Sequence, residues 1–116
     1  MTERGRHAVE RTGEHFRVGP SEVFWDGDDL VVHIDEIGAP IPRRLRGEVR
    51  LKPSYLSQAA HRLDPAGAHV WWPIASHGRV EVAMSEPSLS WSGTGYLDSN
   101  YGTAGLEHGF SYWTWS

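Results

Sequence analysis

Two short segments of the chain combine aromatic rings with groups that can transfer protons. Residues 69–73 read H-V-W-W-P, and residues 93–100 read G-T-G-Y-L-D-S-N. Both patterns predict strands, in which alternate side chains lie on the same face. If the two strands are neighbours, one apolar concavity could hold an acid, an imidazole and two aromatic rings, a set suited to acid–base chemistry. The four side chains of this candidate site are His69, Trp71, Tyr96 and Asp98.

Structural roles also explain these residues. A histidine on a strand commonly serves as a hydrogen-bonded structural residue, because both ring nitrogens can pair with nearby groups. Tryptophans in a small β-domain commonly belong to the core. Asp98 and Asn100 also suit a turn, since their side chains bond nearby backbone amides. The residues alone therefore leave a catalytic and a structural interpretation open.

Other kinds of site are weakly supported. The chain has 11 Lys and Arg against 15 Asp and Glu, a formal charge of -4, and no clustered basic face for nucleic acid. It has no cysteine, which excludes disulfides and thiolate sites and fits a reducing compartment. No glycine-rich nucleotide motif or serine nucleophile elbow is present. The remaining histidines lack metal-ligand spacing and favour solvated or structural roles: His7, His15, His33, His61, His77 and His108.

The elements that must position the candidate site are predicted to be strands. Short β-branched and aromatic runs alternate with clusters of Gly, Pro and Asp, which is typical of an antiparallel sheet. The runs predict strands at residues 22–25, 30–37, 45–51, 69–74 and 79–84, and from residue 89 onward. We expect an all-β domain over residues 16–116, curled into a barrel or sandwich, preceded by a polar arm or loop at residues 1–15.

The connections carry further expectations. Residues 26–29, D-G-D-D, suit a hairpin loop, and residues 64–67, D-P-A-G, suit a turn. Residues 53–60 are expected to hold a short helical turn. Tyr112, Trp113 and Trp115 have the pattern of a buried aromatic strand that stops in mid-pattern, which favours a chain that is incomplete. The N-terminus has no signal-peptide pattern, and no window is long and apolar enough to span a bilayer.

Three segments carry a family resemblance: H-V-W-W-P, W-S-G-T-G-Y-L-D-S-N and F-S-Y-W-T-W-S. With M-T-E-R-G-R, W-D-G-D-D-L-V-V-H-I-D-E, A-P-I-P and L-R-G-E-V-R-L, they resemble the carotenoid 1,2-hydratases, also called hydroxyneurosporene synthases, a lipocalin-like group of hydratases and cyclases. The resemblance extends over the whole chain and matches the middle portion of longer proteins. It implies a lipocalin-like β-barrel that is incomplete here, with open edges.

The resemblance also implies a reaction. The family's enzymes are hydro-lyases that add water, without a cofactor, across the terminal C1–C2 double bond of an acyclic carotenoid. The aspartate of the family's G-Y-x-D motif matches Asp98, the proton donor, and its tyrosine matches Tyr96. The supporting histidine and tryptophan match His69 and Trp71. An apolar pocket would favour a carboxylic acid that keeps its proton, and aromatic faces would stabilise the carbocation. His69 either activates the water or only orients Asp98.

The implied partners are an acyclic carotenoid and water, with no nucleic acid. Because the substrate is a hydrocarbon, the resemblance places the full-length protein in the cytoplasm, peripheral to the inner membrane. Residues 103–107, T-A-G-L-E, depart from the family pattern and predict a different local loop. Two alternatives stay open: a polyene cyclase or isomerase of the same superfamily, and a non-enzymatic β-barrel that binds lipid or pigment. In all three interpretations Trp113 and Trp115 are packing residues.

Overall fold

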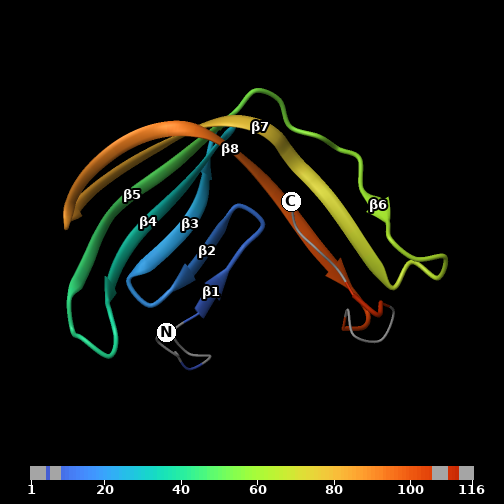
Figure 1. Ribbon diagram of the computed structural model, residues 1–116, viewed down its shortest axis with the longest axis horizontal. Helices are drawn as coiled ribbons and strands as arrows, with labels where there is room; N and C mark the ends of the chain where they lie inside the picture. Colours follow the sequence, from blue (N-terminus) through green and yellow to red (C-terminus); the bar gives the residue numbers. More distant parts are fainter. Residues whose placement is uncertain (1–4, 6–8, 106–109, 113–116) are drawn as a thin grey trace.

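A single antiparallel sheet, bent into an arch, makes up the computed structural model (Figure 1). The structure describes residue 5, residues 9–105 and residues 110–112. The described residues form the strands β1 (Val9–Arg11), β2 (His15–Val18), β3 (Ser21–Asp26), β4 (Asp29–Ile37), β5 (Arg44–Pro53), β6 (His61–Arg62), β7 (His69–Glu86) and β8 (Ser88–Gly102). The all-β, antiparallel prediction is therefore confirmed.

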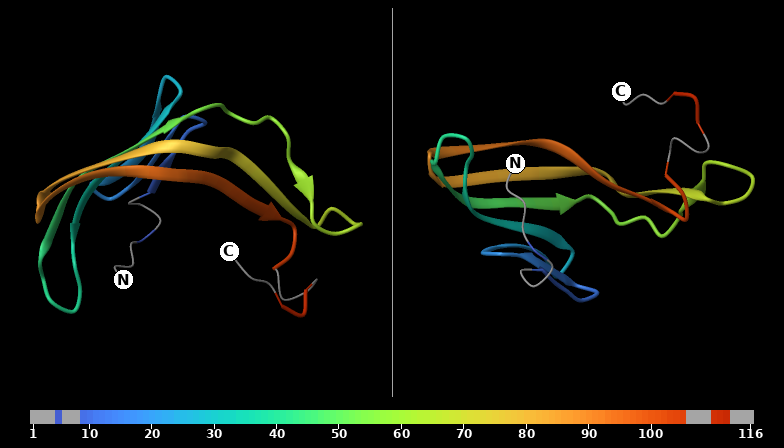
Figure 2. Two further views of the ribbon diagram at one scale, coloured as in Figure 1. Left: turned by 45° about the horizontal axis from the view of Figure 1, so that its top comes forward. Right: turned by 90° about the horizontal axis from the view of Figure 1, so that it is seen from below.

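The strand order explains the arch. Strands β1 to β5 pair in chain order, and β7 follows β5. The long strand β7 pairs with β5 along one half and with the two-residue β6 along the other, while β8 covers its opposite edge. No pairing joins β1 to β8 in the described residues, so the sheet is open and not a barrel (Figure 2). The Cα radius of gyration is 16.6 Å, against about 13 Å for a compact domain of similar length.

The two faces of the sheet differ in chemistry over β3, β4, β5 and the adjoining part of β7. One face carries alternating Val, Leu and Ile side chains, with Val32 opposite Val49, and Val49 opposite Val82. The other carries charged side chains, with His33 opposite Glu48 and Arg50 opposite Glu81. This is the alternation that the sequence predicts for residues 30–37 and 45–51. The deeply buried apolar residues are few: Val31, Leu51 and Ala75.

The hairpin between β3 and β4 forms where the sequence predicts it. Asp26 pairs with Asp29 across the turn. Gly27 has a φ of 61°, a left-handed conformation that glycine adopts without steric cost. The predicted turn at residues 64–67 is also present, with Gly67 at a φ of 68° and its N–H bonded to the Asp64 carbonyl oxygen at 3.1 Å.

One strand, β7, replaces the two strands predicted at residues 69–74 and 79–84. Its register against β8 shifts between Trp72 and Ala75 and again between Ala75 and Gly78. At each shift β7 advances three residues while β8 advances two, which is the signature of a β-bulge. The bulges let one continuous strand bend where the sequence pattern is interrupted. They lie between the two arms of the arch.

The predicted helical turn at residues 53–60 is wrong. Pro53 ends β5, and residues 54–60 then run beside β7 without regular structure. The backbone N–H of Ser54 donates to His77 O at 3.0 Å, and that of Ser57 donates to Ile74 O at 2.8 Å. The indole N–H of Trp72 also donates to Ser57 O, at 2.7 Å. These contacts with β7 satisfy backbone groups that a helix would have paired internally.

The two ends of the chain also differ from expectation. Part of the predicted N-terminal arm is strand, because β1 pairs with β2 through Val9–Val18 and Arg11–Phe16. Tyr112 is 80% exposed and belongs to no strand, so the predicted buried strand does not include it. Trp113 and Trp115 lie outside the described residues. The described residues contain no helix of the length and apolarity needed to cross a membrane.

Candidate active site

The candidate acid and the first candidate tryptophan are in direct contact. Trp71 lies on β7 and Asp98 on the neighbouring β8, and the indole N–H of Trp71 donates to Asp98 Oδ2 at 2.9 Å. Trp71 is paired with Asn100 in the register, which places Trp71 and Asp98 on one face. Asp98 is partly buried. This hydrogen bond fixes the carboxyl group against the ring of Trp71, as the sequence pattern predicts if the strands are neighbours.

The carboxyl group of Asp98 belongs to no ion pair in the described part of the chain. Its hydrogen-bond partner there is the indole of Trp71. An indole N–H donates without carrying a charge. Asp98 also belongs to β8, so the alternative interpretation of residues 98–100 as a turn is wrong. The arrangement is one carboxyl group held by a neutral donor beside an aromatic ring.

A third side chain, His61, joins this pair. His61 is paired with Trp71 in the register of β6 and β7, and the two ring centroids are 5.6 Å apart at 33°. His61, Trp71 and Asp98 therefore form a row across three strands. No pattern in the sequence predicts this placement of His61, because β6 has two residues and no alternation to recognise. Only the pairing with β7 places this histidine.

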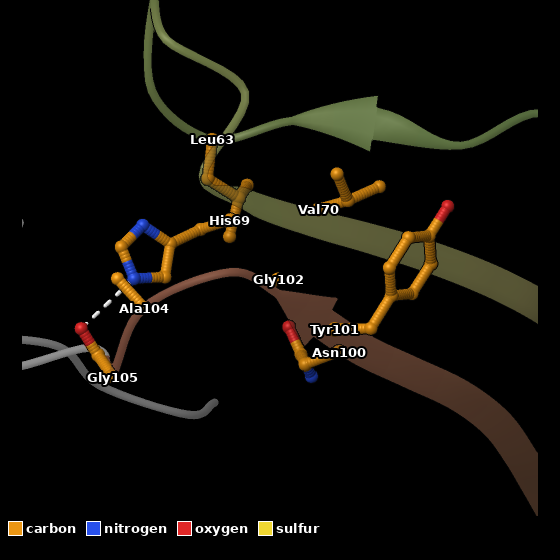
Figure 3. Close-up of a pocket in the computed structure, with 8 residues that line it drawn as sticks. All are labelled: Leu63, His69, Val70, Asn100, Tyr101, Gly102, Ala104 and Gly105. Carbon is orange, nitrogen blue, oxygen red and sulfur yellow. Dashed lines mark hydrogen bonds between the residues drawn. The ribbon is translucent and has the colours of Figure 1, made fainter.

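His69 lies on the same face as Trp71 but contacts different groups (Figure 3). It is 5% exposed. Its Nε2 lies 3.0 Å from the carbonyl oxygen of Gly105, which can only accept, so Nε2 carries the hydrogen. Nδ1 lies 3.5 Å from Asp64 Oδ1 without forming a hydrogen bond. The ring also packs edge-on against Phe110, with centroids 5.1 Å apart.

These contacts tie the start of β7 to the segment that follows β8. No described contact joins the ring of His69 to Asp98, although both residues belong to neighbouring strands. The structure thus brings together Trp71 and Asp98, and it directs the ring nitrogens of His69 toward Gly105 and Asp64.

Asp64 fixes the turn that leads into β7. Its Oδ1 accepts a hydrogen bond from the backbone N–H of His69 at 2.8 Å, and its Oδ2 accepts one from Ala68 N–H at 3.2 Å. Burial raises the pKa of Asp64, but these two hydrogen bonds and the adjacent His69 ring outweigh burial and lower the pKa below its ordinary value. Asp64 is therefore a carboxylate at neutral pH, with a structural role at the entry to the site strand.

Tyr96 is the most open of the four predicted residues. It is 64% exposed, and one residue, Leu97, separates it from Asp98 along β8. Because β8 advances regularly past both bulges, Tyr96 and Asp98 share a face, as predicted. Its ring contacts none of the other three predicted residues in the described structure. The predicted enclosing concavity is thus an open surface at this position.

A pocket of about 290 Å³ lies beyond Asp98, at the end of the β7–β8 pair (Figure 3). It is lined by Leu63, His69, Val70, Asn100, Tyr101, Gly102, Ala104 and Gly105. His69 and Asn100 connect the pocket to the face that carries Trp71 and Asp98. Most of the lining is apolar, so the pocket suits a hydrocarbon group.

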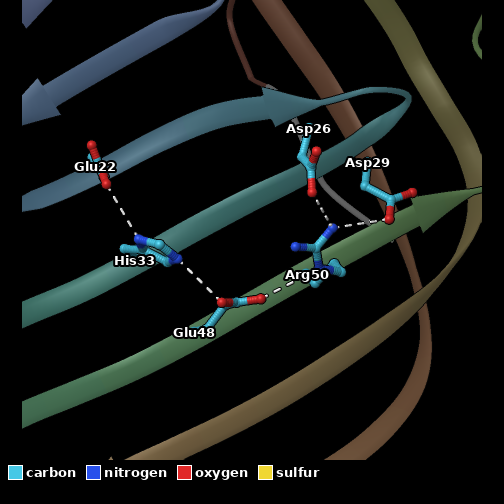
Figure 4. A network of polar contacts seen from close by, with 6 residues as sticks. All are labelled: Glu22, Asp26, Asp29, His33, Glu48 and Arg50. Atoms are coloured by element: carbon cyan, nitrogen blue, oxygen red, sulfur yellow. Dashed lines mark hydrogen bonds and ion pairs between the residues drawn. The ribbon is translucent and has the colours of Figure 1, made fainter.

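A second polar region lies on the same face at the other arm of the arch (Figure 4). We call it the charged cluster, and its members are Glu22, Asp26, Asp29, His33, Glu48 and Arg50. Arg50 Nη1 lies 3.0 Å from Asp26 and 3.1 Å from Asp29, and Arg50 Nε lies 3.3 Å from Glu48. His33 bridges Glu22 and Glu48 at 3.2 Å and 3.1 Å. Every carboxylate of the cluster has a basic partner.

The charged cluster has the character of a structural network. The hydrogen bond that Arg50 donates to Asp26 is the main cause that raises the pKa of Arg50, and the bonds to Asp29 and Glu48 add to it while burial opposes it. A hydrogen bond with His15, at 2.7 Å, is the main cause that lowers the pKa of Glu22. In the described residues no three His, Asp or Glu side chains are placed to hold a metal ion. These contacts link β2, β3, β4 and β5.

Comparison with known proteins identifies the family. The model of the family described as carotenoid hydratase CrtC matches residues 1–116. The acyclic carotenoid 1,2-hydratases of Thiocapsa roseopersicina and Rubrivivax gelatinosus are 50% and 47% identical to this chain over 116 residues, covering 100% of the chain and 29% of each relative. The Rhodobacter capsulatus protein of the same name is 44% identical, covering 99% of the chain and 41% of that relative.

The alignment covers all of this chain but only part of each relative. The chain is aligned over its whole length, whereas it spans 29% to 41% of the length of these three curated relatives. No solved structure matches the chain significantly. The segments around Trp71 and Asp98 lie inside the matched region. The chain therefore belongs to the carotenoid hydratase CrtC family.

Proposed function

We propose that this chain carries the acid site of a hydro-lyase that adds water to the terminal C1–C2 double bond of an acyclic carotenoid. Two findings support the proposal: the relatives are named acyclic carotenoid 1,2-hydratases, and the indole N–H of Trp71 holds Asp98 Oδ2 at 2.9 Å. The second carries the chemical argument, because it distinguishes the two oxygens of Asp98.

The proton comes from Asp98 Oδ1. An indole N–H can only donate, so Oδ2 must act as an acceptor while the contact lasts. Because the carbonyl oxygen of a carboxylic acid is a stronger acceptor than its hydroxyl oxygen, we assign the hydrogen of the protonated acid to Oδ1. The electron pair of the C1–C2 double bond takes this proton at C2, a C2–H bond forms, and Asp98 becomes a carboxylate. The positive charge remains at C1, a tertiary centre.

Aromatic faces stabilise the cation at C1. A ring face contributes about 0.5 to 2 kcal/mol toward a nearby cation and supplies no competing nucleophile. We assign this role to Trp71 and Tyr96. The imidazole of His61 lies beside the Trp71 indole, with ring centroids 5.6 Å apart at 33°, and we propose that the substrate meets the part of the indole that His61 does not cover. Tyr96 lies on the same sheet face as Asp98, and its exposure leaves its ring free to meet the polyene.

Water completes the addition. Its oxygen forms a bond to C1, and one of its protons passes to the Asp98 carboxylate, which restores the acid. Asp98 thus serves first as general acid and then as general base. We assign His69 a positioning role, since its ring nitrogens are directed at Gly105 and Asp64. It holds the segment after β8 beside the pocket.

The pocket accommodates an end group of the substrate. Its volume of about 290 Å³ lies at the lower limit of small-molecule sites, about 300 to 1,000 Å³. A long polyene must then extend beyond it, along the sheet. Because such a substrate is a hydrocarbon, we place the enzyme in the cytoplasm, at the surface of the inner membrane.

Product analysis in labelled water tests the reaction. The purified protein is incubated with lycopene, an acyclic carotene, in water enriched in oxygen-18, and products are weighed by mass spectrometry. We expect a product heavier by one labelled water. Asp98→Asn should lower its rate by about 10² to 10⁴. The control, Asp28→Asn, changes an exposed turn carboxylate far from the site and should leave the rate unchanged.

Other outcomes would change the proposed reaction or the role of Asp98. A product of unchanged mass would overturn hydration in favour of cyclisation or isomerisation. Binding of lycopene with no product at all would support a carrier. Equal rates for Asp98→Asn and the unmodified protein would remove Asp98 from the acid role.

A further inference from the structure

The loop between β4 and β5 presents apolar side chains to solvent at one tip of the arch (Figure 1). Ile37, at the end of β4, is 57% exposed, and Ile41, inside the loop, is 63% exposed. Leu45, at the start of β5, is 39% exposed. The loop also contains Pro40 and Pro42. We call residues 37–45 the apolar tip.

The apolar tip has a defined shape. The N–H of Gly38 donates to Arg43 O at 2.8 Å, and the N–H of Arg43 donates to Ile41 O at 2.9 Å. These bonds close the loop, and the paired strands β4 and β5 hold its two ends. A loop that is already closed loses little conformational freedom when it binds a surface.

Arginines surround the apolar tip. Arg44 and Arg46 share the carboxylate of Asp35, at 3.0 Å and 3.4 Å, and Arg46 also lies 3.9 Å from Glu86. Arg43 is exposed, and its guanidinium has no ion-pair partner in the described part of the chain. The tip thus combines projecting isoleucines with one positive charge that no described carboxylate neutralises.

We infer that the apolar tip docks on an anionic lipid surface. Exposed aliphatic side chains enter the boundary between headgroups and acyl chains, while adjacent arginines attract anionic headgroups. A stable protein interface needs about 800 Å² per partner, and a narrow hairpin tip suits insertion among lipids better. If the proposed function holds, docking through the apolar tip brings the protein to a substrate that is insoluble in water.

The position of the tip is compatible with access to the site. Figure 2 shows the β4–β5 turn on one arm of the arch, while the ends of β7 and β8, which carry His69 and Asp98, lie on the other. Docking through the tip therefore leaves the candidate site uncovered.

Vesicle binding without any substrate tests the docking separately from the reaction. The protein is sedimented with phosphatidylcholine vesicles that contain or lack phosphatidylglycerol. We expect binding that requires phosphatidylglycerol and weakens with salt. Ile41→Asp should abolish it, and Arg43→Gln should weaken it about fivefold. The control, Tyr55→Asp, alters a 59% exposed residue outside the tip and outside the pocket and should bind normally.

A label gives a second readout that does not depend on sedimentation. The chain has no cysteine, so Ile41→Cys and Tyr55→Cys each carry a polarity-sensitive fluorophore at a single site. Anionic vesicles should shift the emission of the label at position 41 to the blue and leave the label at position 55 unchanged. Equal shifts, or vesicle binding by Ile41→Asp at the normal level, would overturn the inference. So would a dimer in sedimentation velocity that Ile41→Asp dissociates, since the tip would then be a protein contact.

Discussion

The charged cluster and the candidate site lie on one face of one sheet, yet they treat carboxylates in opposite ways. In the cluster, each carboxylate has an arginine or histidine partner within 3.3 Å. At the site, Asp98 meets a neutral indole. Charged partners hold the carboxylates of the cluster in ion pairs, whereas the described partner of Asp98 carries no charge. Carboxyl groups on the same face of the sheet can therefore have different roles, and the partner of each carboxyl group distinguishes these roles.

Among variants that change a partner and keep Asp98, the largest effect is expected at Trp71. Trp71→Phe keeps an aromatic ring but removes the N–H that holds Asp98 Oδ2. Under the proposed function Asp98 then loses its alignment, and we expect kcat for hydration to fall by up to about 10². Steady-state kinetics with lycopene measures it.

Trp72→Phe is the matched control, since the neighbouring indole points to the other face and donates to Ser57 O. It should keep kcat and lose about 1 kcal/mol of unfolding free energy. Equal losses of kcat in the two variants would show that general packing, not the Asp98 contact, matters.

A smaller effect is expected at His61, which lies against Trp71. If stacking positions the indole, His61→Ala should lower kcat by about twofold to tenfold, the value of one aromatic pair. His61→Phe should then restore most of the rate and leave the pH profile of kcat unchanged. A pH profile altered by both variants to the same extent would instead indicate that the imidazole itself moves a proton.

The smallest effect on activity is expected in the charged cluster. The pKa of Glu22 is lowered from its ordinary value of 4.5, chiefly by the hydrogen bond with His15. A depressed carboxyl pKa contributes stability above the unfolded value and loses it as pH falls through the folded value. Glu22→Gln should therefore lower Tm at pH 7 and converge with the unmodified protein below pH 4.5.

Thermal melts across this range measure the Glu22 effect, and kcat at pH 7 should be unchanged. A large loss of hydration in Glu22→Gln would break the distinction between a structural cluster and a catalytic site.

Much of the sheet was predictable because its residues alternate. Apolar and charged residues alternate along β5, and D-G-D-D marks the turn of the β3–β4 hairpin, and both elements formed as predicted. The short helical turn predicted at residues 53–60 was wrong, because the backbone after Pro53 is paired to β7 by contacts that no local pattern reveals.

The site was predictable where residues share a strand face and unpredictable where it depends on partners from elsewhere. The Trp71–Asp98 contact follows from alternation once β7 and β8 are neighbours. The surroundings of His69 involve Asp64 and Gly105, which are set by loop geometry. His61 reached Trp71 through a two-residue strand that carries no periodic signal.

The bulges of β7 have a consequence for length. From Trp72 to Gly78 the strand uses six residue steps, while β8 covers the same stretch from Ser99 to Gly95 in four. At about 3.3 Å per residue, β7 has roughly 7 Å of surplus contour there. This surplus length lets β7 bend between the two arms of the arch. A sequence shortened by two residues at this point would keep every strand and both polar regions. The sheet would bend less between its arms, and the two polar regions would face the same direction.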